Sequence, residues 1–138
     1  MKKAVVDTNV FVSGVIKEES PSGNLIKLWK ESRFILVTSP EIIREIVKVF
    51  DYPKIRTKYH VEQIQVKALI DRIYLKSEIV EGVYALEKLK DAADNKFLAC
   101  AFEGNADYVV SGDKGILCMK HFHGTQIVSV QDFIKVFW

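Results

Sequence analysis

The stretch Ala4-Val5-Val6-Asp7-Thr8-Asn9 decides how this chain can fold, because a short apolar run ends there in an acid and two small polar residues. A run of β-branched residues with polar boundaries predicts a buried strand. A second stretch of the same kind, Tyr108-Val109-Val110-Ser111-Gly112-Asp113, follows much later in the chain. Parallel α/β sheets place their functional sites just beyond the carboxyl ends of their strands. We therefore expect Asp7 and Asp113 at such a site.

The composition is that of an ordinary globular protein. The chain has 138 residues, of which 49% are hydrophobic and 28% charged, with a formal net charge of +2. These values predict one domain over residues 1–138, and the small positive excess does not by itself indicate a nucleic-acid partner. No apolar stretch reaches the roughly 20 residues of a membrane span, and no signal peptide is expected. Cys100 and Cys118 lack a CxxC spacing, which favours reduced thiols in a cytoplasmic protein, with a disulfide as the alternative.

Strand and helix patterns alternate along the chain. We expect strands at 3–6, 34–37, 78–80, 107–110 and 126–130. We expect helices at 9–16, around 25–29, from 40 to 50, and at 61–75, 92–102, 116–119 and 132–137. This alternation predicts an α/β protein with a mostly parallel sheet that helices cover on both faces.

A third acid, Asp94, is a candidate site residue because its side chain is expected to point toward the core. At about 100° per residue, it projects onto the same face of its predicted helix as Phe97 and Leu98. An ionised carboxylate that faces a core is costly unless a cation or hydrogen-bond donors receive it. The alternative is that Asp91 and Asp94 cap the start of the helix, where the helix dipole favours an anion.

A fourth acid, Glu45, borders the apolar stripe of its predicted helix, whereas Arg44 and Lys48 lie further toward solvent. Taken alone, a Glu at such an edge is usually solvated, and Asp7 or Asp113 alone would serve equally well as a helix cap. Four acids together, two of them beyond the ends of buried strands, favour a shared site over four separate surface roles.

Four carboxylates in one place raise each other's pKa unless a cation neutralises them. Mg²⁺ and Mn²⁺ prefer oxygen ligands and keep several waters, which suits catalysis on phosphates. Three short polar side chains lie beside these acids in the sequence: Thr8, Asn9 and Ser111. They are expected to hold a carboxylate rotamer, a metal-bound water or a phosphate, although turn and cap chemistry is about as well favoured for Thr8.

Four blocks of this sequence together resemble the PIN domain family. They occur in the order and approximate spacing of that family and cover nearly the whole chain. The blocks are VVDTNV from Val5, SPEIIREIV from Ser39, DAADNKFLACA from Asp91 and ADYVVSGDKGIL from Ala106. The chain is most similar to the branch that contains VapC-like toxins of toxin–antitoxin pairs. It departs from many relatives at Ala92-Ala93, where they carry a Pro and a further Asp, and at Ser111, where Thr is frequent.

The resemblance implies a Rossmann-like α/β/α sandwich with a central, mostly parallel sheet of about five strands. It implies a metal-dependent ribonuclease whose acidic quartet is Asp7, Glu45, Asp94 and Asp113, with Asn9 and Ser111 in support. The aspartates of this quartet would bind Mg²⁺ or Mn²⁺, and Glu45 would complete the site and help to position the hydrolytic water. Cleavage would leave a 5′-phosphate and a 3′-hydroxyl. The resemblance also implies a homodimer and an antitoxin protein as partner.

An RNA substrate needs positive charge near the acidic site. The best candidate is the stretch 53–60, which combines Lys54, Arg56 and Lys58 with a tyrosine that a base can stack on. A solvated connector is slightly favoured for this cluster. Further basic residues lie next to the acids in the sequence: Arg44, Lys48, Lys96 and Lys114.

Two other function classes stay open at the level of sequence. A phosphatase of the haloacid dehalogenase type also begins with a strand and an Asp, but it needs a second Asp where this chain has Asn9. A non-catalytic RNA- or protein-binding module would keep the fold without needing the quartet.

The pair His121 and His123 lacks a third ligand nearby for zinc, which favours a loop or core role. The apolar end, Val136-Phe137-Trp138, is expected either to dock on the core or to contact a partner.

Overall fold

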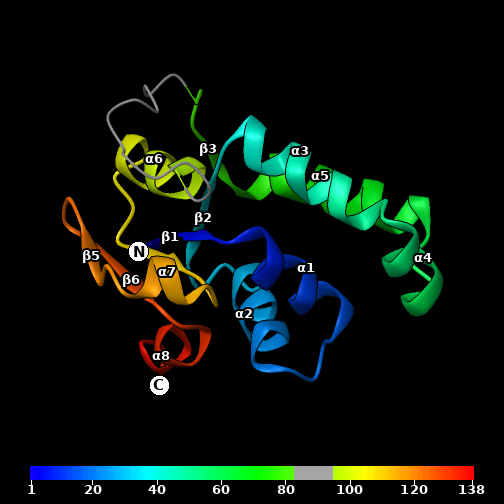
Figure 1. Ribbon diagram of the computed structural model, residues 1–138, viewed down its shortest axis with the longest axis horizontal. Helices are drawn as coiled ribbons and strands as arrows, with labels where there is room; N and C mark the ends of the chain where they lie inside the picture. The colour runs from blue at the N-terminus through cyan, green and yellow to red at the C-terminus, as the bar shows by residue number, and fades with distance from the viewer. Residues whose placement is uncertain (83–94) are drawn as a thin grey trace.

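The computed structural model describes residues 1–82 and 95–138. Its strands are β1 (Lys3–Val6), β2 (Ile35–Thr38), β3 (Glu78–Ile79), β4 (Tyr108–Val110), β5 (His121–Phe122) and β6 (Thr125–Val128). Its helices are α1 (Thr8–Ile16), α2 (Pro21–Lys30), α3 (Pro40–Phe50), α4 (Pro53–Tyr59), α5 (Gln63–Lys76), α6 (Asn95–Glu103), α7 (Lys114–Leu117) and α8 (Val130–Lys135). Figure 1 shows how these elements are arranged.

The strands form one sheet in the order β3-β2-β1-β4-β6-β5. All neighbouring pairs are parallel except β5 and β6, which are antiparallel. The expected mostly parallel α/β architecture is therefore confirmed. Within the described residues the sheet has six strands, where the sequence predicted about five. The additional strand, β5, has only two residues, which is too short to produce an alternating pattern in the sequence.

The order of the strands places β1 and β4 side by side at the centre of the sheet. Val5 pairs with Val109 and Val6 pairs with Val110, so the two strands end at the same edge. The chain leaves β1 toward β2 on one side and leaves β4 toward β6 on the other. This is a topological switch point, where α/β proteins open a crevice beyond the strand ends.

Serine side chains start three of the helices that surround the sheet. The hydroxyl of Ser20 accepts a hydrogen bond from the backbone of Gly23, and that of Ser39 accepts one from Ile42. Ser129 starts α8 in the same way. Each bond satisfies one of the backbone N–H groups that a helix start leaves without a partner. In α2 and α3 a proline follows the serine at the first helical position.

The sheet has a hydrophobic layer on each face. Helices α2 and α8 lie on one side of it and α6 lies on the other (Figure 1). Phe11 of α1 meets Trp29 of α2 with ring centroids 5.5 Å apart, and Phe34 meets Phe133 of α8 at 5.0 Å. These four rings are among the most deeply buried in the described part of the chain. Edge-to-face contacts of this kind add to the stabilisation that comes from burial alone.

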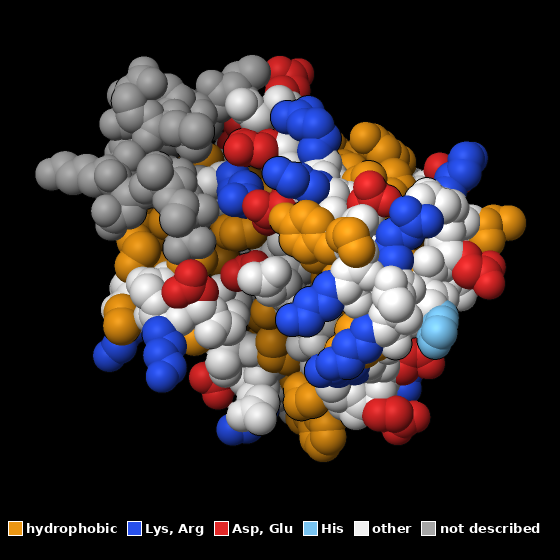
Figure 2. Space-filling model, turned by 45° about the vertical axis from the view of Figure 1, so that its right-hand side comes forward, with side chains coloured by type: hydrophobic (Ala, Val, Ile, Leu, Met, Phe, Trp, Pro, Cys, Tyr) orange, Lys and Arg blue, Asp and Glu red, His pale blue; other side chains and the backbone are white. Residues whose placement is uncertain are grey.

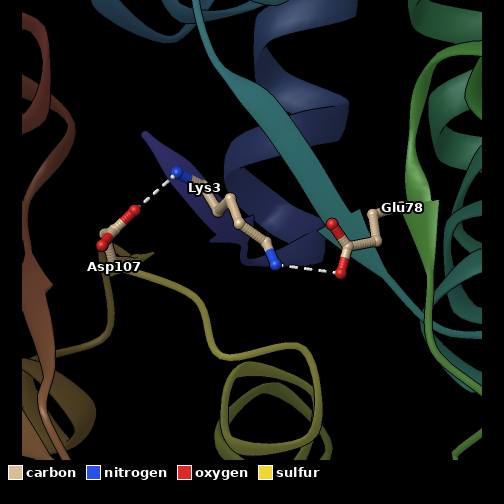
Figure 3. A network of polar contacts seen from close by, with 3 residues as sticks. All are labelled: Lys3, Glu78 and Asp107. Atoms are coloured by element: carbon tan, nitrogen blue, oxygen red, sulfur yellow. Dashed lines mark hydrogen bonds and ion pairs between the residues drawn. The ribbon is translucent and has the colours of Figure 1, made fainter. Parts of the chain in front are cut away.

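Lys3 connects three strands near the end of the sheet opposite the switch point (Figure 3). Its backbone N–H donates to Asp107, which precedes β4, with an N–O distance of 2.8 Å. Its ammonium group reaches past β2 to Glu78 of β3, at 3.0 Å. Both contacts hold β1 in place relative to the strands on either side of it.

The sequence left alternatives for two segments, residues 53–60 and the apolar C-terminal end, and the structure gives both a defined position. Residues 53–59 form helix α4, not a connector, and a seven-residue helix is too short for its periodicity to be recognised. Phe137 docks on the core, with its ring centroid 5.2 Å from that of Phe133, while Trp138 is 93% exposed. Among the described residues, no helix is both long enough and apolar enough to cross a membrane.

Candidate active site

Asp7 lies directly beyond β1 and is nearly buried, with 6% of its surface exposed. Its Oδ1 accepts a hydrogen bond from the backbone N–H of Asn9 at 3.0 Å, which caps α1. Its Oδ2 accepts one from the hydroxyl of Ser111 at 2.8 Å. Asp7 therefore caps a helix and also belongs to a polar cluster between two strands. The two interpretations from the sequence, a helix cap and a member of a shared acidic site, are compatible.

Ser111 connects Asp7 to the second acid. It is fully buried beyond the end of β4, and its hydroxyl both donates to Asp7 and accepts from the backbone N–H of Asp113 at 3.0 Å. The Oδ1 atom of Asp113 accepts from the N–H of Gly115 at 2.7 Å and so caps α7. A chain of hydrogen bonds thus runs from the end of β1 to the end of β4 and fixes the relative positions of both carboxylates.

Glu45 approaches the same place from α3. Its Oε2 lies 2.9 Å from the ammonium group of Lys96 on α6, and their side chains are 33% and 18% exposed. The Lys96 nitrogen also lies 5.1 Å from the centre of the Phe97 ring. Lys96 was one of the basic residues noted beside the acids in the sequence. No local pattern indicated its ion pair with Glu45, since 51 positions separate the two residues in the chain.

These residues line one cleft of about 970 Å³. Its polar wall contains Asp7, Asn9, Ser13, Ser22, Glu45, Lys96 and Asp113, and its apolar wall includes Val49, Tyr52, Ile55 and Phe97. Figure 2 shows a face with acidic side chains beside a hollow that has hydrophobic side chains in its floor, and Lys and Arg side chains gather along the same face. A polar cleft with an apolar wall of this size can accept a small ligand or part of a polymer.

The supporting residues take different positions. Asn9 is exposed and lines the cleft. Thr8 begins α1 and is buried, and its hydroxyl has no hydrogen-bond partner in the described part of the chain. The basic residues Lys54, Arg56 and Lys58 project from α4 into solvent and do not line the cleft. Arg56 instead pairs with Asp51 at 3.2 Å.

Asp94 lies outside the described residues, as does Asp91, so its expected place in the quartet stays a prediction. Within the described ranges, no three His, Cys, Asp or Glu side chains come close enough to hold a metal ion by themselves. The donors that are present suit a hard cation nevertheless. Asp7 and Asp113 both line the cleft, and the Oδ2 atom of Asp113 makes no hydrogen bond within residues 1–82 and 95–138.

Sequence patterns missed the residues that α4 and its start contribute to the cleft. Tyr52 and Ile55 lie in its wall, and Tyr52 is 46% exposed. Their position depends on the angle between helices α3 and α4, and no local sequence pattern predicts that angle. The only local signal was Pro53, which is typical of a helix start as well as of a helix end.

The fold and the cleft define an α/β protein with an acidic site at its topological switch point. Comparison with known families then specifies the class. The family model described as PIN domain matches residues 3–115, and the chain belongs to this family. The matched range contains β1 to β4 and the described cleft acids Asp7, Glu45 and Asp113.

Three individual proteins are similar to this chain. An uncharacterized protein of Methanocaldococcus jannaschii, MJ1680, is 30% identical over 118 residues, which cover 86% of this chain and 75% of that protein. The crystal structure of VapBC2 from Rickettsia felis bound to a DNA fragment from their promoter contains a similar chain, with a TM-score of 0.61 and 15% identity, covering 92% of this chain and 98% of that one. PAE2754 from Pyrobaculum aerophilum gives a TM-score of 0.59 at 12% identity, covering 99% and 88%. At these identities the two structures support the fold.

Proposed function

We propose that this protein is a metal-dependent endoribonuclease and the toxin of a toxin–antitoxin pair. PIN domains are generally nucleases, and this chain is a member of that family. The observation that carries the proposal is the hydrogen-bonded link from Asp7 through Ser111 to Asp113, in the cleft that Glu45 also lines. A buried serine that holds two acids at the ends of adjacent strands suits a site that must keep carboxylates close together.

The carboxylates would serve as ligands. In this proposal Asp7, Asp94 and Asp113 hold one or two Mg²⁺ or Mn²⁺ ions, directly or through water. When bound, such an ion polarises the phosphodiester and stabilises the leaving oxygen. The hydrogen bonds from Ser111 and Asn9 fix the rotamer of Asp7 before the ion arrives, so less entropy is lost on binding.

Glu45 would orient the attacking water. Its ion pair with Lys96 holds the carboxylate in the cleft and leaves its other oxygen, Oε1, to accept a hydrogen bond from that water. The nucleophile then attacks phosphorus and the 3′-oxygen leaves, which gives a 5′-phosphate and a 3′-hydroxyl. Thr8 would support the start of α1, and Lys54, Arg56 and Lys58 would attract the RNA backbone from outside the cleft.

The proposed biological role rests on the fold comparison. VapBC2 from Rickettsia felis was crystallised with a promoter DNA fragment, and its similar chain supports an antitoxin partner for this protein. A homodimer and a cytoplasmic location belong to the same proposal. A small open reading frame next to the gene would support the pairing, and growth arrest on expression that its product relieves would test it directly.

Cleavage of a labelled single-stranded RNA in Mg²⁺, Mn²⁺ or EDTA tests the enzymatic part. We expect cleavage that needs the metal ion and that falls by at least about a hundredfold in Asp7→Asn, as is typical when one essential group at a catalytic site is lost. Asp71→Asn is the matched control, because Asp71 is an exposed aspartate of α5 away from the cleft. Metal-independent cleavage, or equal rates in Asp7→Asn and the wild-type protein, would overturn the proposal.

A further inference from the structure

The acidic cleft continues into a smaller lobe of about 190 Å³ between α1 and α4. The two spaces share four lining residues, which are Asn9, Ser13, Val49 and Ile55. The two spaces therefore lie next to each other along α1, with these residues between them. We call the smaller lobe the α1–α4 groove and define it by Ser13 and Ile16 on one wall and Ile55 and Tyr59 on the other.

The α1 wall of this groove follows from helical spacing. Asn9, Ser13 and Ile16 lie at positions i, i+4 and i+7, so they share one stripe that faces α3 and α4. Lys17 ends the helix and places a cation at the rim of the groove. The stripe combines small polar and aliphatic side chains with one positive charge at its far end.

The opposite wall supplies aromatic rings at both ends of α4. Tyr52 is the residue just before the helix and lines the main cleft, while Tyr59 is its last residue and lines the groove. The ammonium group of Lys58 lies 5.4 Å from the centre of the Tyr59 ring. At 1.5 Å rise per residue, the two tyrosines are about 10 Å apart along the helix.

A small groove that a tyrosine and a lysine line together suits a nucleobase and its phosphate. The groove is smaller than the roughly 300–1,000 Å³ of drug-sized ligand sites, so it suits one ring rather than a helix or a peptide. Base–aromatic stacking accepts any base, but the base must be unpaired and accessible. The distance between the tyrosines corresponds to about three steps of a stacked strand at 3.4 Å per step.

We propose that Tyr59 and Lys17 form a stacking subsite of the α1–α4 groove for an unpaired base a few nucleotides from the scissile phosphate, with Tyr52 stacking a second base nearer the acids. The proposal rests on the proposed ribonuclease function and specifies its substrate as single-stranded RNA that occupies both lobes. Duplex RNA is excluded from the subsite because its bases already stack on each other.

Binding of a fluorescent oligouridine of about twelve nucleotides tests this inference, measured by anisotropy in Mg²⁺ with full-length Asp7→Asn protein. On that background we expect Tyr59→Leu to weaken binding by about fivefold or more, and Tyr59→Phe to retain it. Tyr74→Leu is the matched control, because Tyr74 is an exposed tyrosine of α5 outside the groove. Lys17→Ala is expected to lower the salt dependence by about one counterion.

The subsite is overturned if Tyr59→Leu binds as tightly as its parent, if Tyr74→Leu loses as much, or if an RNA duplex responds equally to Tyr59→Leu. Thermal melts check folding, and if Tyr59→Leu is unfolded, Tyr52→Leu and Lys17→Ala decide the matter. The two proposals can fail separately. Tyrosine-dependent binding without any cleavage by the wild-type protein would support the subsite and contradict the ribonuclease proposal. Cleavage without tyrosine-dependent binding would support the ribonuclease proposal and contradict the subsite.

Discussion

At the scale of single residues, one buried hydroxyl determines the geometry of the site. Ser111 is fully buried, and its hydroxyl is both a donor to Asp7 and an acceptor from the backbone of Asp113. A carboxylate that is nearly buried is costly unless donors receive it, so the serine stabilises the charge of Asp7 as well as its position. The neighbouring ion pair with Lys96 holds the third acid, Glu45, in position.

Replacing Ser111 by Ala is expected to destabilise the protein by about 1–3 kcal/mol, because the Oδ2 atom of Asp7 and the N–H of Asp113 both lose their partner. Chemical denaturation measures the change. Ser77→Ala is the control, since the buried Ser77 hydroxyl has no hydrogen-bond partner within the described ranges. We expect that variant to stay within about 0.5 kcal/mol of the wild-type protein. Equal losses in the two variants would contradict the role of the Ser111 hydrogen bonds.

At the scale of elements, the helix that carries Glu45 has a well-defined start. Ser39 is buried, its hydroxyl accepts from the N–H of Ile42 at 3.3 Å, and Pro40 takes the first helical position. Ile42, Ile46 and Phe50 then pack into the core along one face. That packing directs Glu45 toward the cleft while Arg44 stays in solvent.

Ser39→Ala removes this cap and is expected to cost about 1 kcal/mol of stability. The local consequence is faster amide hydrogen exchange at Ile42, because its N–H loses the hydroxyl acceptor. Ser20→Ala is the matched control, since Ser20 caps α2 in the same way and leaves α3 unchanged. If exchange at Ile42 did not change in Ser39→Ala, or changed as much in Ser20→Ala, the proposed cap would be wrong.

At the scale of the whole molecule, packing gives the two cysteines opposite properties. Cys118 is exposed, whereas Cys100 of α6 lies in the core with 2% of its surface exposed. Burial, together with the nearby carboxylates of Glu103 and Glu78, raises the pKa of the Cys100 thiol from 9.0 to about 12. The sequence predicted that both cysteines are reduced, and in the structure neither forms a disulfide. The fold therefore keeps one thiol protonated and inaccessible.

The stability of the protein should fall as the pH rises above about 9. Between pH 9 and pH 12 the unfolded chain releases the Cys100 proton while the folded chain retains it, so rising pH favours unfolding. Denaturation curves over this range measure the effect, and Cys100→Ala should remove that part of the pH dependence while Cys118→Ala keeps it. A thiol reagent should modify Cys118 rapidly and Cys100 only on unfolding. Rapid modification of both would contradict the assigned burial.

The fold was largely predictable, because the features that define it repeat along the chain. The strands that precede Asp7 and Ser111 were recognisable from their β-branched runs, and the mostly parallel sheet that they were expected to join is confirmed. The helix at 53–59 and strand β5 were not, since a few residues carry too little periodicity. Asp7, Glu45 and Asp113 were expected together from their position and facing, and all three line one cleft; their roles, and the place of Asp94, stay predictions.

By itself, the sequence determined which residues carry negative charge and on which elements they lie, because strand ends and helix faces are local properties of the chain. Only the tertiary structure decided which of them meet. The link through Ser111, the pairing of Glu45 with Lys96, and the α1–α4 groove beside the cleft all join residues that are distant in sequence. Such contacts depend on the order of the strands and on the packing of helices across them, and no local pattern encodes those distances.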